Sequence, residues 1–381
     1  MTRIYLDHNA TTRLDPEARA AMMPFLDEEL GNPSSIHGAG RAARDAVERA
    51  RDQVAALLSA SRDEIVFTSG GTEGDNLAVR GLAEAARAAD PRKNRVVVSP
   101  LEHPAVLAST RALEARGFRV TLLAVDEAGR LDLDEVRRAL DGEVALLTVQ
   151  LANHELGNIF PLAELAERAR AVGAAIHTDA VQAATKIAID VRALGVDALT
   201  VSAHKLHGPK GTGAIWLKAG QTLEPHSVGG HQERERRPGT ENVAGIVGFG
   251  VAAERARASL ASERSKITRL RDRLEAGARE LGARVNGDLA ARTGNTSNLA
   301  WEGIEGEWVV QALDLENVCV STGAACSSGS LEPSPVLLGL GQARARAREA
   351  VRFSLGRDNT DEEIDRVLAL LPEILRRIRS A

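Results

Sequence analysis

Residues 202–211 contain a lysine, Lys205, that could act as a nucleophile. The apolar run 198–201 predicts a short buried strand that stops just before it, and the following Gly-Pro pair predicts a turn, so the amine would be held at a strand end. To form a Schiff base, the amine must lose its proton, which requires burial or a cationic neighbour to lower its pKa from roughly 10.4. His204 and His207 are the nearest candidates for that neighbour. Taken alone, such a stretch is more often a basic, solvated junction, so other residues must support the interpretation.

A second stretch, residues 68–73, has the composition of an anion-binding turn. Residues 65–67 predict a strand, Gly70 and Gly71 a turn, and residues 76–79 the continuation of a helix. Backbone N–H groups and the positive end of the helix would then converge on one point, which suits a phosphate group. The lysine of a P-loop is missing, and an ordinary strand-to-helix turn explains the pattern as well.

Apolar strands alternate with helices over residues 60–217, which predicts an α/β fold with a mainly parallel sheet covered by helices on both faces. The expected strands lie near residues 65–67, 95–99, 120–125, 144–149, 174–179 and 198–201. In such sheets, ligands bind at the carboxyl ends of the strands. The candidates that follow strand ends are the Gly70-Gly71 turn, His103, Asn153, Asp179 and Lys205. The sequence therefore predicts one site at this edge of the sheet.

The composition limits the classes of protein and partner. A chain of 381 residues can form two or three domains, and 44% hydrophobic residues are typical of a soluble globular protein. The net charge of -5, with Lys and Arg interspersed among Asp and Glu, gives no reason to expect a nucleic acid or a membrane as partner. No signal-peptide core or long apolar span occurs, and two cysteines indicate a reducing compartment, so we expect a cytoplasmic protein.

The pattern changes beyond the sheet segment. A helix is expected early in the chain over residues 16–30, and a long one over about residues 259–281. We place a domain boundary near residue 257. The expected domains are a large one of residues 15–257 and a smaller α+β one of residues 1–14 and 258–381.

In the smaller domain, a strand at residues 318–320 leads into residues 321–330, which are all small or polar. Such a run predicts an exposed, mobile loop, and it carries Cys326. Cys319 lies between two valines of the strand, so we expect it to be a buried structural thiol.

A Schiff-base lysine, a phosphate-binding turn and an acid at a strand end together describe the chemistry of pyridoxal 5'-phosphate (PLP). The lysine would carry the aldehyde and the turn would hold the phosphate. Asp179 would keep the pyridine nitrogen protonated, so that the ring accepts electrons. No other common cofactor needs all three groups, and we expect no metal site.

Several motifs occur together: residues 5–7 with 10–12, 32–35, 68–73, 102–103, 177–180, 202–205 and the cysteine loop. Over residues 4–356 this combination resembles the cysteine desulfurases of the NifS/IscS type, which are class V aminotransferase-like PLP enzymes of fold type I. The resemblance implies a homodimeric enzyme that converts L-cysteine to L-alanine and retains the sulfur as a persulfide. The sulfur would pass to an acceptor such as an iron–sulfur scaffold protein or a tRNA-thiolation protein.

The resemblance also implies roles for individual residues around the cofactor ring. Lys205 would be the Schiff-base lysine and a proton shuttle, and Asp179 the partner of the pyridinium. His103 would stack on the ring and assist proton transfer, while Gln182 would bond the ring hydroxyl.

Two further groups of residues follow from the same resemblance. Those implied at the phosphate are Gly71, Thr72, Ser202, His204 and, from the other subunit, Thr240. Asn153 and Arg352 would bind the substrate carboxylate, for which a planar guanidinium is well suited. The alternation of residues 351–355 places Arg352 on the face opposite the core.

Cys326 would be the sulfur acceptor within the enzyme. Its thiolate must attack the sulfur of the bound substrate and then carry the persulfide outward, which needs a mobile loop. The continuation at residues 331–334 fits the long-loop group of the family more than the short-loop group. The family usually has Asn where this chain has His154, so the role of that residue stays open.

Alternatives of two kinds remain. An aminotransferase or a selenocysteine lyase would share the fold, but an aminotransferase has no use for Cys326. A selenocysteine lyase would share every substrate contact except one atom. A non-catalytic sulfur-relay or scaffold protein is the other kind, and the joint presence of Lys205, Asp179 and Cys326 argues against it. The sequence determines neither the sulfur acceptor nor the turnover rate.

Overall fold

A computed structural model describes residues 3–322 and 332–380. The chain forms the predicted α/β fold, with a seven-stranded sheet in the order β2-β8-β7-β6-β5-β3-β4. The strands are β2 (Ile65–Thr68), β3 (Arg95–Val98), β4 (Arg119–Leu122), β5 (Val144–Thr148), β6 (Ala175–Asp179), β7 (Ala198–Ser202) and β8 (Gly213–Leu217). Strand β8 runs antiparallel to both of its neighbours, and the other pairings are parallel. The mainly parallel sheet expected from the alternating pattern is thus confirmed.

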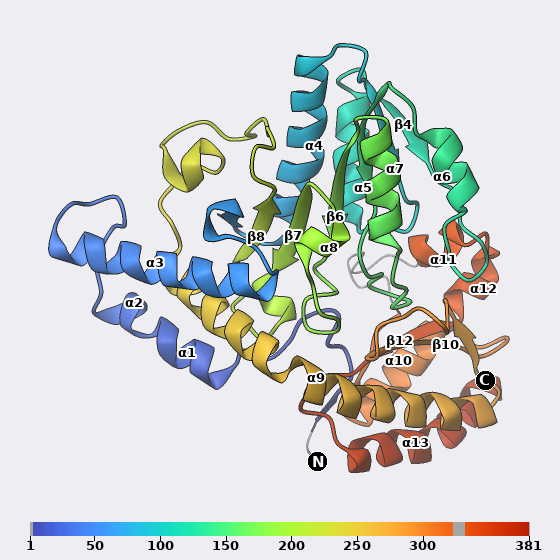
Figure 1. Cartoon of the computed structure of the whole chain (residues 1–381). Helices are drawn as coiled ribbons and strands as arrows, with labels where there is room; N and C mark the ends of the chain where they lie inside the picture. Colours follow the sequence, from blue (N-terminus) through green and yellow to red (C-terminus); the bar gives the residue numbers. More distant parts are fainter. Residues whose placement is uncertain (1–2, 323–331, 381) are drawn as a thin grey trace.

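Both faces of this sheet are buried. Neighbouring residues of one strand enter different hydrophobic clusters: Val96 and Val98 pack on one side, and Val97 on the other. This follows from the alternation of side chains along a strand, and it explains why these strands are apolar throughout. The helices around the sheet include α4 (Gly71–Ala89), α5 (Pro104–Glu114), α6 (Leu133–Ala139), α7 (Leu162–Ala171) and α8 (Val191–Leu194) (Figure 1).

The second part of the fold has its own hydrophobic cluster. Its strands are β9 (Arg284–Asn286), β10 (Thr296–Ala300) and β12 (Ala350–Ser354), which form an antiparallel sheet, and β1 (Ile4–Tyr5), which pairs in parallel with β11 (Val318–Cys319). Its helices are α10 (Gly306–Leu315) and α13 (Asp361–Arg379), whereas the buried residues of α11 (Pro335–Gly339) and α12 (Arg344–Arg348) belong to the cluster beside the large sheet. The start of the chain therefore lies beside its last third (Figure 1).

One long helix, α9 (Val243–Glu280), joins the two parts. Ala252 and Ala256 belong to the cluster beside the large sheet, whereas Ile267 and Leu274 belong to the cluster of the second part. We propose that the boundary between the two domains lies near residue 257, because the helix changes its packing partners there. In the described part of the chain, no helix is both long and apolar enough to cross a membrane.

Helix α9 begins earlier than residue 259, where the sequence pattern predicted it. Its first turns contain glycines, which disfavour helices in isolation. Here the glycines allow close packing: a Cβ on Gly248 would lie 2.5 Å from Met22 Sδ, and one on Gly250 would lie 2.6 Å from Ala50 Cα. These contacts are with α1 (Pro16–Met22) and α3 (Gly38–Leu57). Tertiary packing thus outweighs the local propensity.

The helix predicted over residues 16–30 is also different in the structure. It is divided into α1 and α2 (Pro24–Asp27), and residues 28–30 are not helical. Pro24 lacks a backbone N–H and therefore starts a new helix where the first one ends.

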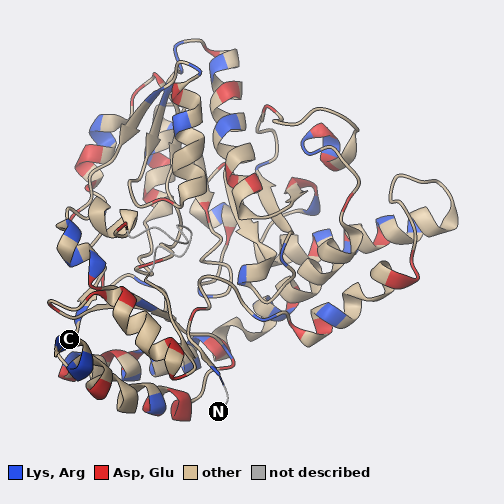
Figure 2. Ribbon diagram, turned by 180° about the vertical axis from the view of Figure 1, so that it is seen from behind, with Lys and Arg blue, Asp and Glu red and all other residues tan. Residues whose placement is uncertain are grey.

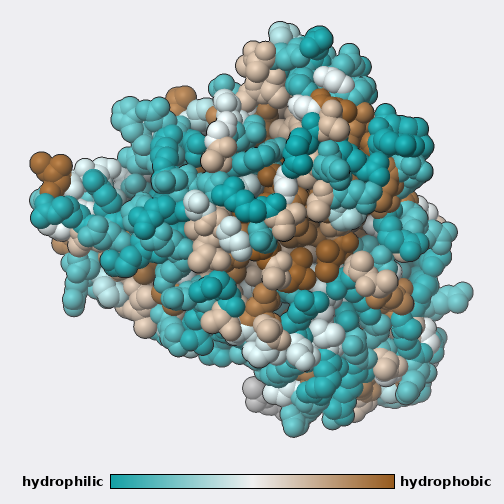
Figure 3. All heavy atoms as spheres, viewed as in Figure 1, coloured by the Kyte–Doolittle hydropathy of each residue, from teal (hydrophilic) through white to brown (hydrophobic). Residues whose placement is uncertain are grey.

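Charged residues of both signs are interspersed along the surface helices (Figure 2). On the face shown in Figure 3, hydrophilic residues cover most of the surface, and apolar residues gather near the middle of the molecule.

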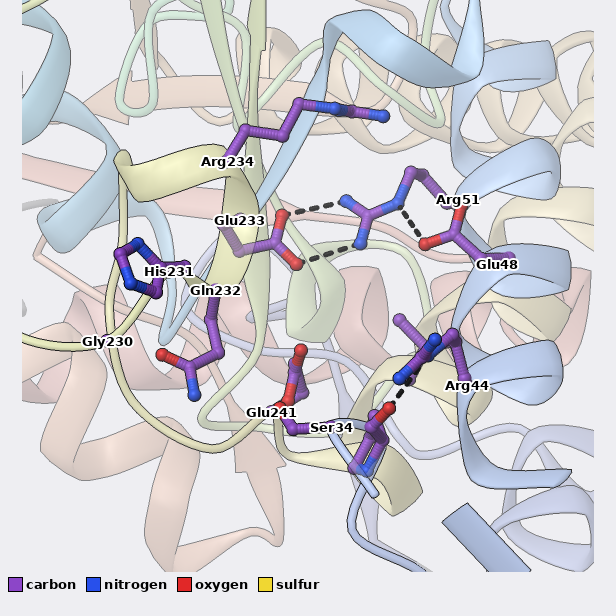
Figure 4. Close-up of a pocket in the computed structure, with 12 residues that line it drawn as sticks. Ser34, Arg44, Glu48, Arg51, Gly230, His231, Gln232, Glu233, Arg234 and Glu241 are labelled. Atoms are coloured by element: carbon purple, nitrogen blue, oxygen red, sulfur yellow. Dashed lines mark hydrogen bonds and ion pairs between the residues drawn. The ribbon is translucent and has the colours of Figure 1, made fainter. Parts of the chain in front are cut away.

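A buried ion pair holds the loop after β8 against the edge of the sheet. Arg51 donates from Nη1 and Nη2 to the two carboxylate oxygens of Glu233, at 2.7 and 2.8 Å (Figure 4). The same carboxylate accepts from the backbone N–H of Phe67 at 2.8 Å. Glu233 and Arg234 have φ of 48° and 57°, a left-handed conformation that such residues seldom adopt. The ion pair therefore stabilises a strained turn, which lies beside a cavity of about 440 Å³ (Figure 4).

Replacing Arg51 with methionine is expected to lower the free energy of unfolding by about 3–5 kcal/mol, because it leaves the carboxylate of Glu233 buried without its charged partner. Urea unfolding followed by tryptophan fluorescence measures the change. Arg269→Gln is a matched control, since Arg269 also makes a two-point contact with a carboxylate, that of Asp361, but an exposed one. Equal unfolding midpoints for the two variants would contradict a stabilising role for the buried pair.

Candidate active site

A cavity of about 320 Å³ lies where the parallel strands end. The predicted residues that line it are Gly71, Thr72, His103, Asp179, Gln182, Ser202, His204, Lys205 and Arg352. Asp179 and Ser202 are the last residues of β6 and β7, Gly71 begins α4, and His103 precedes the first turn of α5. The sheet thus brings residues that lie far apart in the sequence to one edge, and Arg352 joins them from β12.

Lys205 lies in a single 3-10 turn directly after β7. Its Nζ donates to the backbone carbonyl of Asn9 at 2.5 Å and to that of Ala10 at 2.7 Å. These carbonyls belong to the segment that follows β1, so the start of the chain positions the amine at the cavity. The fixed location predicted for Lys205 at a strand end is what the structure shows.

The two histidines beside Lys205 supply no positive charge near neutral pH. Burial, together with the positive charges of Lys205 and Lys210, lowers the pKa of His204 to about 4. Burial and the charge of Arg357 also lower the pKa of His207. The hypothesis that a neighbouring histidine helps Lys205 lose its proton is therefore not supported.

Asp179 and Asp75 form the acidic wall of the cavity, and a third buried carboxyl group, that of Glu102, interacts with them. Oδ1 of Asp179 accepts from the backbone N–H of Val181 at 2.8 Å. Burial and the negative charge of Asp179 raise the pKa of Asp75 well above its usual range. Glu102 behaves in the same way, and burial is again the larger cause. Both shifts favour the protonated form of these two groups, which weakens their repulsion with Asp179.

Behind this wall lies a fully buried histidine, His177. Burial lowers its pKa to about 3, so its ring is neutral. The ring nitrogens lie 2.9 Å from Thr148 Oγ1 and 3.1 Å from Thr200 Oγ1, and Nε2 lies 3.7 Å from Asp75 Oδ1. A neutral ring with two hydroxyl partners packs β6 against its neighbours and adds no charge to the cavity.

The start of α4 fits a phosphate group. Gly70 has a φ of 154°, which favours glycine, and a Cβ on Gly71 would lie 2.9 Å from Val181 Cγ2, so larger residues would obstruct the turn. Ser202 is 2% exposed, and its Oγ has no hydrogen-bond partner within the described residues. An unpaired buried hydroxyl beside the positive end of a 19-residue helix is the arrangement expected for a bound anion.

Arg352 is almost fully buried. Its Nη2 donates to Asp7 Oδ1 at 2.7 Å, and its Nη1 donates to the carbonyl of His154 at 3.1 Å. Its Nε is buried and has no partner in the part of the chain that the structure describes. The guanidinium is thus held in place with N–H groups left over, as a site for a carboxylate requires.

The backbone of Arg352 also anchors the segment that leads to Cys326. Its N–H donates to the carbonyl of Ser321 at 2.6 Å, and its carbonyl accepts from the N–H of Ser321 at 3.2 Å. The chain that enters residues 323–331 therefore starts beside the cavity. Cys326 itself lies outside the described residues.

Two other predicted residues do not line the cavity. Oδ1 of Asn153 accepts from the N–H groups of Glu155 and Leu156, and its Nδ2 donates to the carbonyl of Leu101. Asn153 thus closes a turn, and its contact with a substrate stays a prediction. Thr240 lies exposed in the loop after β8, so its contact with the partner subunit also stays a prediction.

The cavity is also lined by residues without an assigned role in the sequence analysis: Asn9, Ala10, Asp75, Gln150, His154 and Val181. The ring of His154 packs edge-on against His103, with ring centroids 5.5 Å apart and an interplanar angle of 73°. Asn9 and Ala10 contribute backbone carbonyls, which leave no signal in a sequence. In the described part of the chain, no group of three or more His, Cys, Asp or Glu residues could hold a metal ion.

Comparison with known proteins gives concordant results. Residues 4–367 match the family described as "Aminotransferase class-V". A curated cysteine desulfurase of Nostoc sp. is 48% identical over 382 residues, which are 100% of this chain and 94% of the relative. A solved structure described as a NifS-like protein superposes with a TM-score of 0.92 and is 36% identical, covering 98% of this chain and 100% of its own. A structure described as SspA in complex with cysteine has a TM-score of 0.81 and 31% identity, covering 94% and 100%.

Proposed function

This chain belongs to the class-V aminotransferase family, among its NifS-like cysteine desulfurases, and we propose that it converts L-cysteine to L-alanine with PLP as cofactor and Cys326 as the persulfide carrier. The observation that carries the cofactor assignment is the cavity itself. One space is lined by the amine of Lys205, the carboxylate of Asp179 and the unpaired hydroxyl of Ser202 beside the start of α4.

PLP, when bound, supplies an aldehyde that an amine can capture and a protonated ring that draws electrons away from the substrate. Lys205 would capture the aldehyde, because its Nζ is held at the cavity by two backbone carbonyls. Asp179 would keep the proton on the ring nitrogen, and Gln182 would bond the ring hydroxyl. The residues that would hold the phosphate are Gly71, Thr72, Ser202 and His204, with Thr240 from the partner subunit.

The remaining cavity residues would act on the substrate. Arg352 would bind the carboxylate of L-cysteine through the N–H groups that its contacts with Asp7 and His154 leave over. His103 would move protons together with Lys205. Removing the proton from the substrate Cα, and later returning protons to both Cβ and Cα, completes the conversion to L-alanine.

Cys326 would accept the sulfur. Its thiolate attacks the sulfur of the substrate, so that an S–S bond forms while the C–S bond of the substrate breaks, and the electron pair left on carbon takes up a proton. Thr322 lies next to Ser321, which is bonded to Arg352 at the cavity, and the four residues that follow Thr322 and end at Cys326 can extend about 14 Å. A homodimer, a protein acceptor such as an iron–sulfur scaffold, and a cytoplasmic location are parts of the same proposal.

The experiment compares the wild type with Cys326→Ala in the presence of PLP, L-cysteine and a thiol reductant, and it measures sulfide and alanine together. The wild type is expected to release equal amounts of both. The variant is expected to lose both products while it keeps the absorbance of bound PLP. Cys319→Ala is the matched control, because Cys319 is the other thiol of the chain, and burial raises its pKa.

Either of two results would refute this assignment. If Cys326→Ala is as active as the wild type, the thiol carries no sulfur. If alanine never forms from cysteine although PLP is bound, an aminotransferase of the same fold is the better description.

A further inference from the structure

A second lysine, Lys186, is buried behind the wall of the cavity. It lies in the run of turns that follows β6, and only 9% of its surface is exposed. Its Nζ donates to Oε1 of Gln182 at 2.6 Å, which is its one hydrogen bond within the described residues. A buried amine is costly unless it has a function or a strong partner, and none of the steps above uses it.

This hydrogen bond is the first in a chain that reaches Lys205. Nε2 of Gln182 donates to the backbone carbonyl of Asn9 at 2.8 Å. The same carbonyl accepts from Lys205 Nζ at 2.5 Å. Lys186 is therefore linked through one side chain and one carbonyl to the amine at the centre of the site.

The link to Lys186 determines which end of the Gln182 amide faces the cavity. The two ends of an amide have nearly the same shape, so its hydrogen bonds decide its orientation. Because Lys186 donates to Oε1, the nitrogen Nε2 must point the other way, toward Asn9 and the cavity that Gln182 lines. Nε2 carries two N–H groups and Asn9 accepts one, so the second is available to an acceptor in the cavity.

We propose that Lys186 is a positioning residue that fixes the amide of Gln182, so that an N–H group faces the ring hydroxyl oxygen of bound PLP. This inference rests on the proposed function, which supplies the acceptor. Lys186 touches neither cofactor nor substrate in this arrangement and acts through Gln182.

The charges around Lys186 are consistent with this role. Burial lowers its pKa well below the usual value, and the positive charges of Lys205 and Arg352 lower it further. An uncharged amine still donates, so the hydrogen bond to Gln182 does not depend on the charge. Besides these two residues, His8 faces Lys186, and burial holds the pKa of His8 at about 4.

The test uses Lys186→Met in the full-length protein loaded with PLP, and its readout is the pH midpoint of the absorbance change of the bound cofactor. A hydrogen bond to the ring oxygen favours its ionised form, so losing that bond makes the oxygen hold its proton more strongly. We expect the midpoint to rise by about one pH unit in the variant, as loss of one hydrogen bond to a charged acceptor predicts. Methionine has a similar length and no polar group, so the variant should fold.

A double-mutant cycle separates positioning from a direct effect of charge. If Lys186 acts through Gln182, then Gln182→Met should raise the midpoint by itself, and adding Lys186→Met should change it no further. An upward shift by Lys186→Met that persists in the Gln182→Met background would overturn the proposal, because the lysine would then act on Lys205 directly. A midpoint that stays at the wild-type value in Lys186→Met would overturn it as well.

Lys93→Met is the matched control. Lys93 is also partly buried and donates to two backbone carbonyls, those of Val144 and Val172, at 3.1 and 3.3 Å, but it precedes β3 at the other end of the sheet. We expect no shift of the midpoint in this variant. If the wild-type protein takes up no PLP, the proposed function is contradicted. If it takes up PLP but the midpoints do not shift as expected, only the inference about Lys186 fails.

Discussion

Alanine production from cysteine is expected to fall at least about 1,000-fold in Lys205→Ala, because one side chain provides both the amine that captures the cofactor aldehyde and a proton carrier. The structure supports this through the position of Lys205 Nζ, which two backbone carbonyls hold at the cavity. Neither His204 nor His207 can replace it, since an imidazole forms no Schiff base, and burial lowers the pKa of both rings and so makes them weaker proton acceptors. Amino-acid analysis after a fixed time of incubation measures the loss.

Two comparisons make the Lys205 prediction specific. Lys210→Ala removes an exposed lysine from the same segment and is expected to keep wild-type activity. A small primary amine added to Lys205→Ala should restore part of the proton transfer if the missing group is an amine. Activity within tenfold of the wild type in Lys205→Ala would show that another residue captures the cofactor.

The sheet and its site edge could be predicted because the signals are local. Parallel strands buried on both faces must be apolar throughout, and their carboxyl ends must meet at one edge, so Asp179 and Lys205 could be placed together before the structure was known. The turn at Gly70-Gly71 was also predictable, because a pair of glycines between a strand and a helix indicates a turn. In the structure, Gly70 has the backbone angle that favours glycine, and Gly71 approaches Val181 closely.

Other parts depend on contacts between distant segments. The first half of α9 has glycines that local propensity disfavours, and only its packing on α1 and α3 makes it helical. Asn9 reaches Lys205 because the segment after β1 lies along residues 204–207, where the N–H of Thr12 donates to the carbonyl of His204. A backbone carbonyl has no residue type, so no sequence pattern could indicate this contact.

The protonation states of the site residues could not be predicted from the sequence either. His204 was a reasonable cation to place beside a nucleophilic lysine, but burial removes its charge. The positive groups that act on one another are instead Lys186, Lys205 and Arg352, which come from three separate segments. Burial depends on the whole fold, and therefore pKa shifts of this kind cannot be inferred from neighbours in the chain.

Substrate selection gives a second large effect. Arg352→Gln is expected to lower kcat/KM for L-cysteine by about 100- to 1,000-fold, because the variant loses two hydrogen bonds between charged groups in a buried site. Most of the loss should appear in KM, since the carboxylate is bound both before and during the reaction. Arg346→Gln, which removes an exposed arginine just before β12, is the matched control and should leave both parameters unchanged.

Cysteamine, which is cysteine without its carboxylate, shows whether the loss comes from that contact. If Arg352 binds the carboxylate, wild type and Arg352→Gln should process cysteamine at similar, low rates, and the preference for cysteine should disappear only in the variant. If the variant instead loses activity on both compounds to the same extent, Arg352 acts on the structure of the site. That result would direct attention to its other contacts, because Asp7 and the backbone carbonyl of His154 would then lose the side chain that joins them at the cavity.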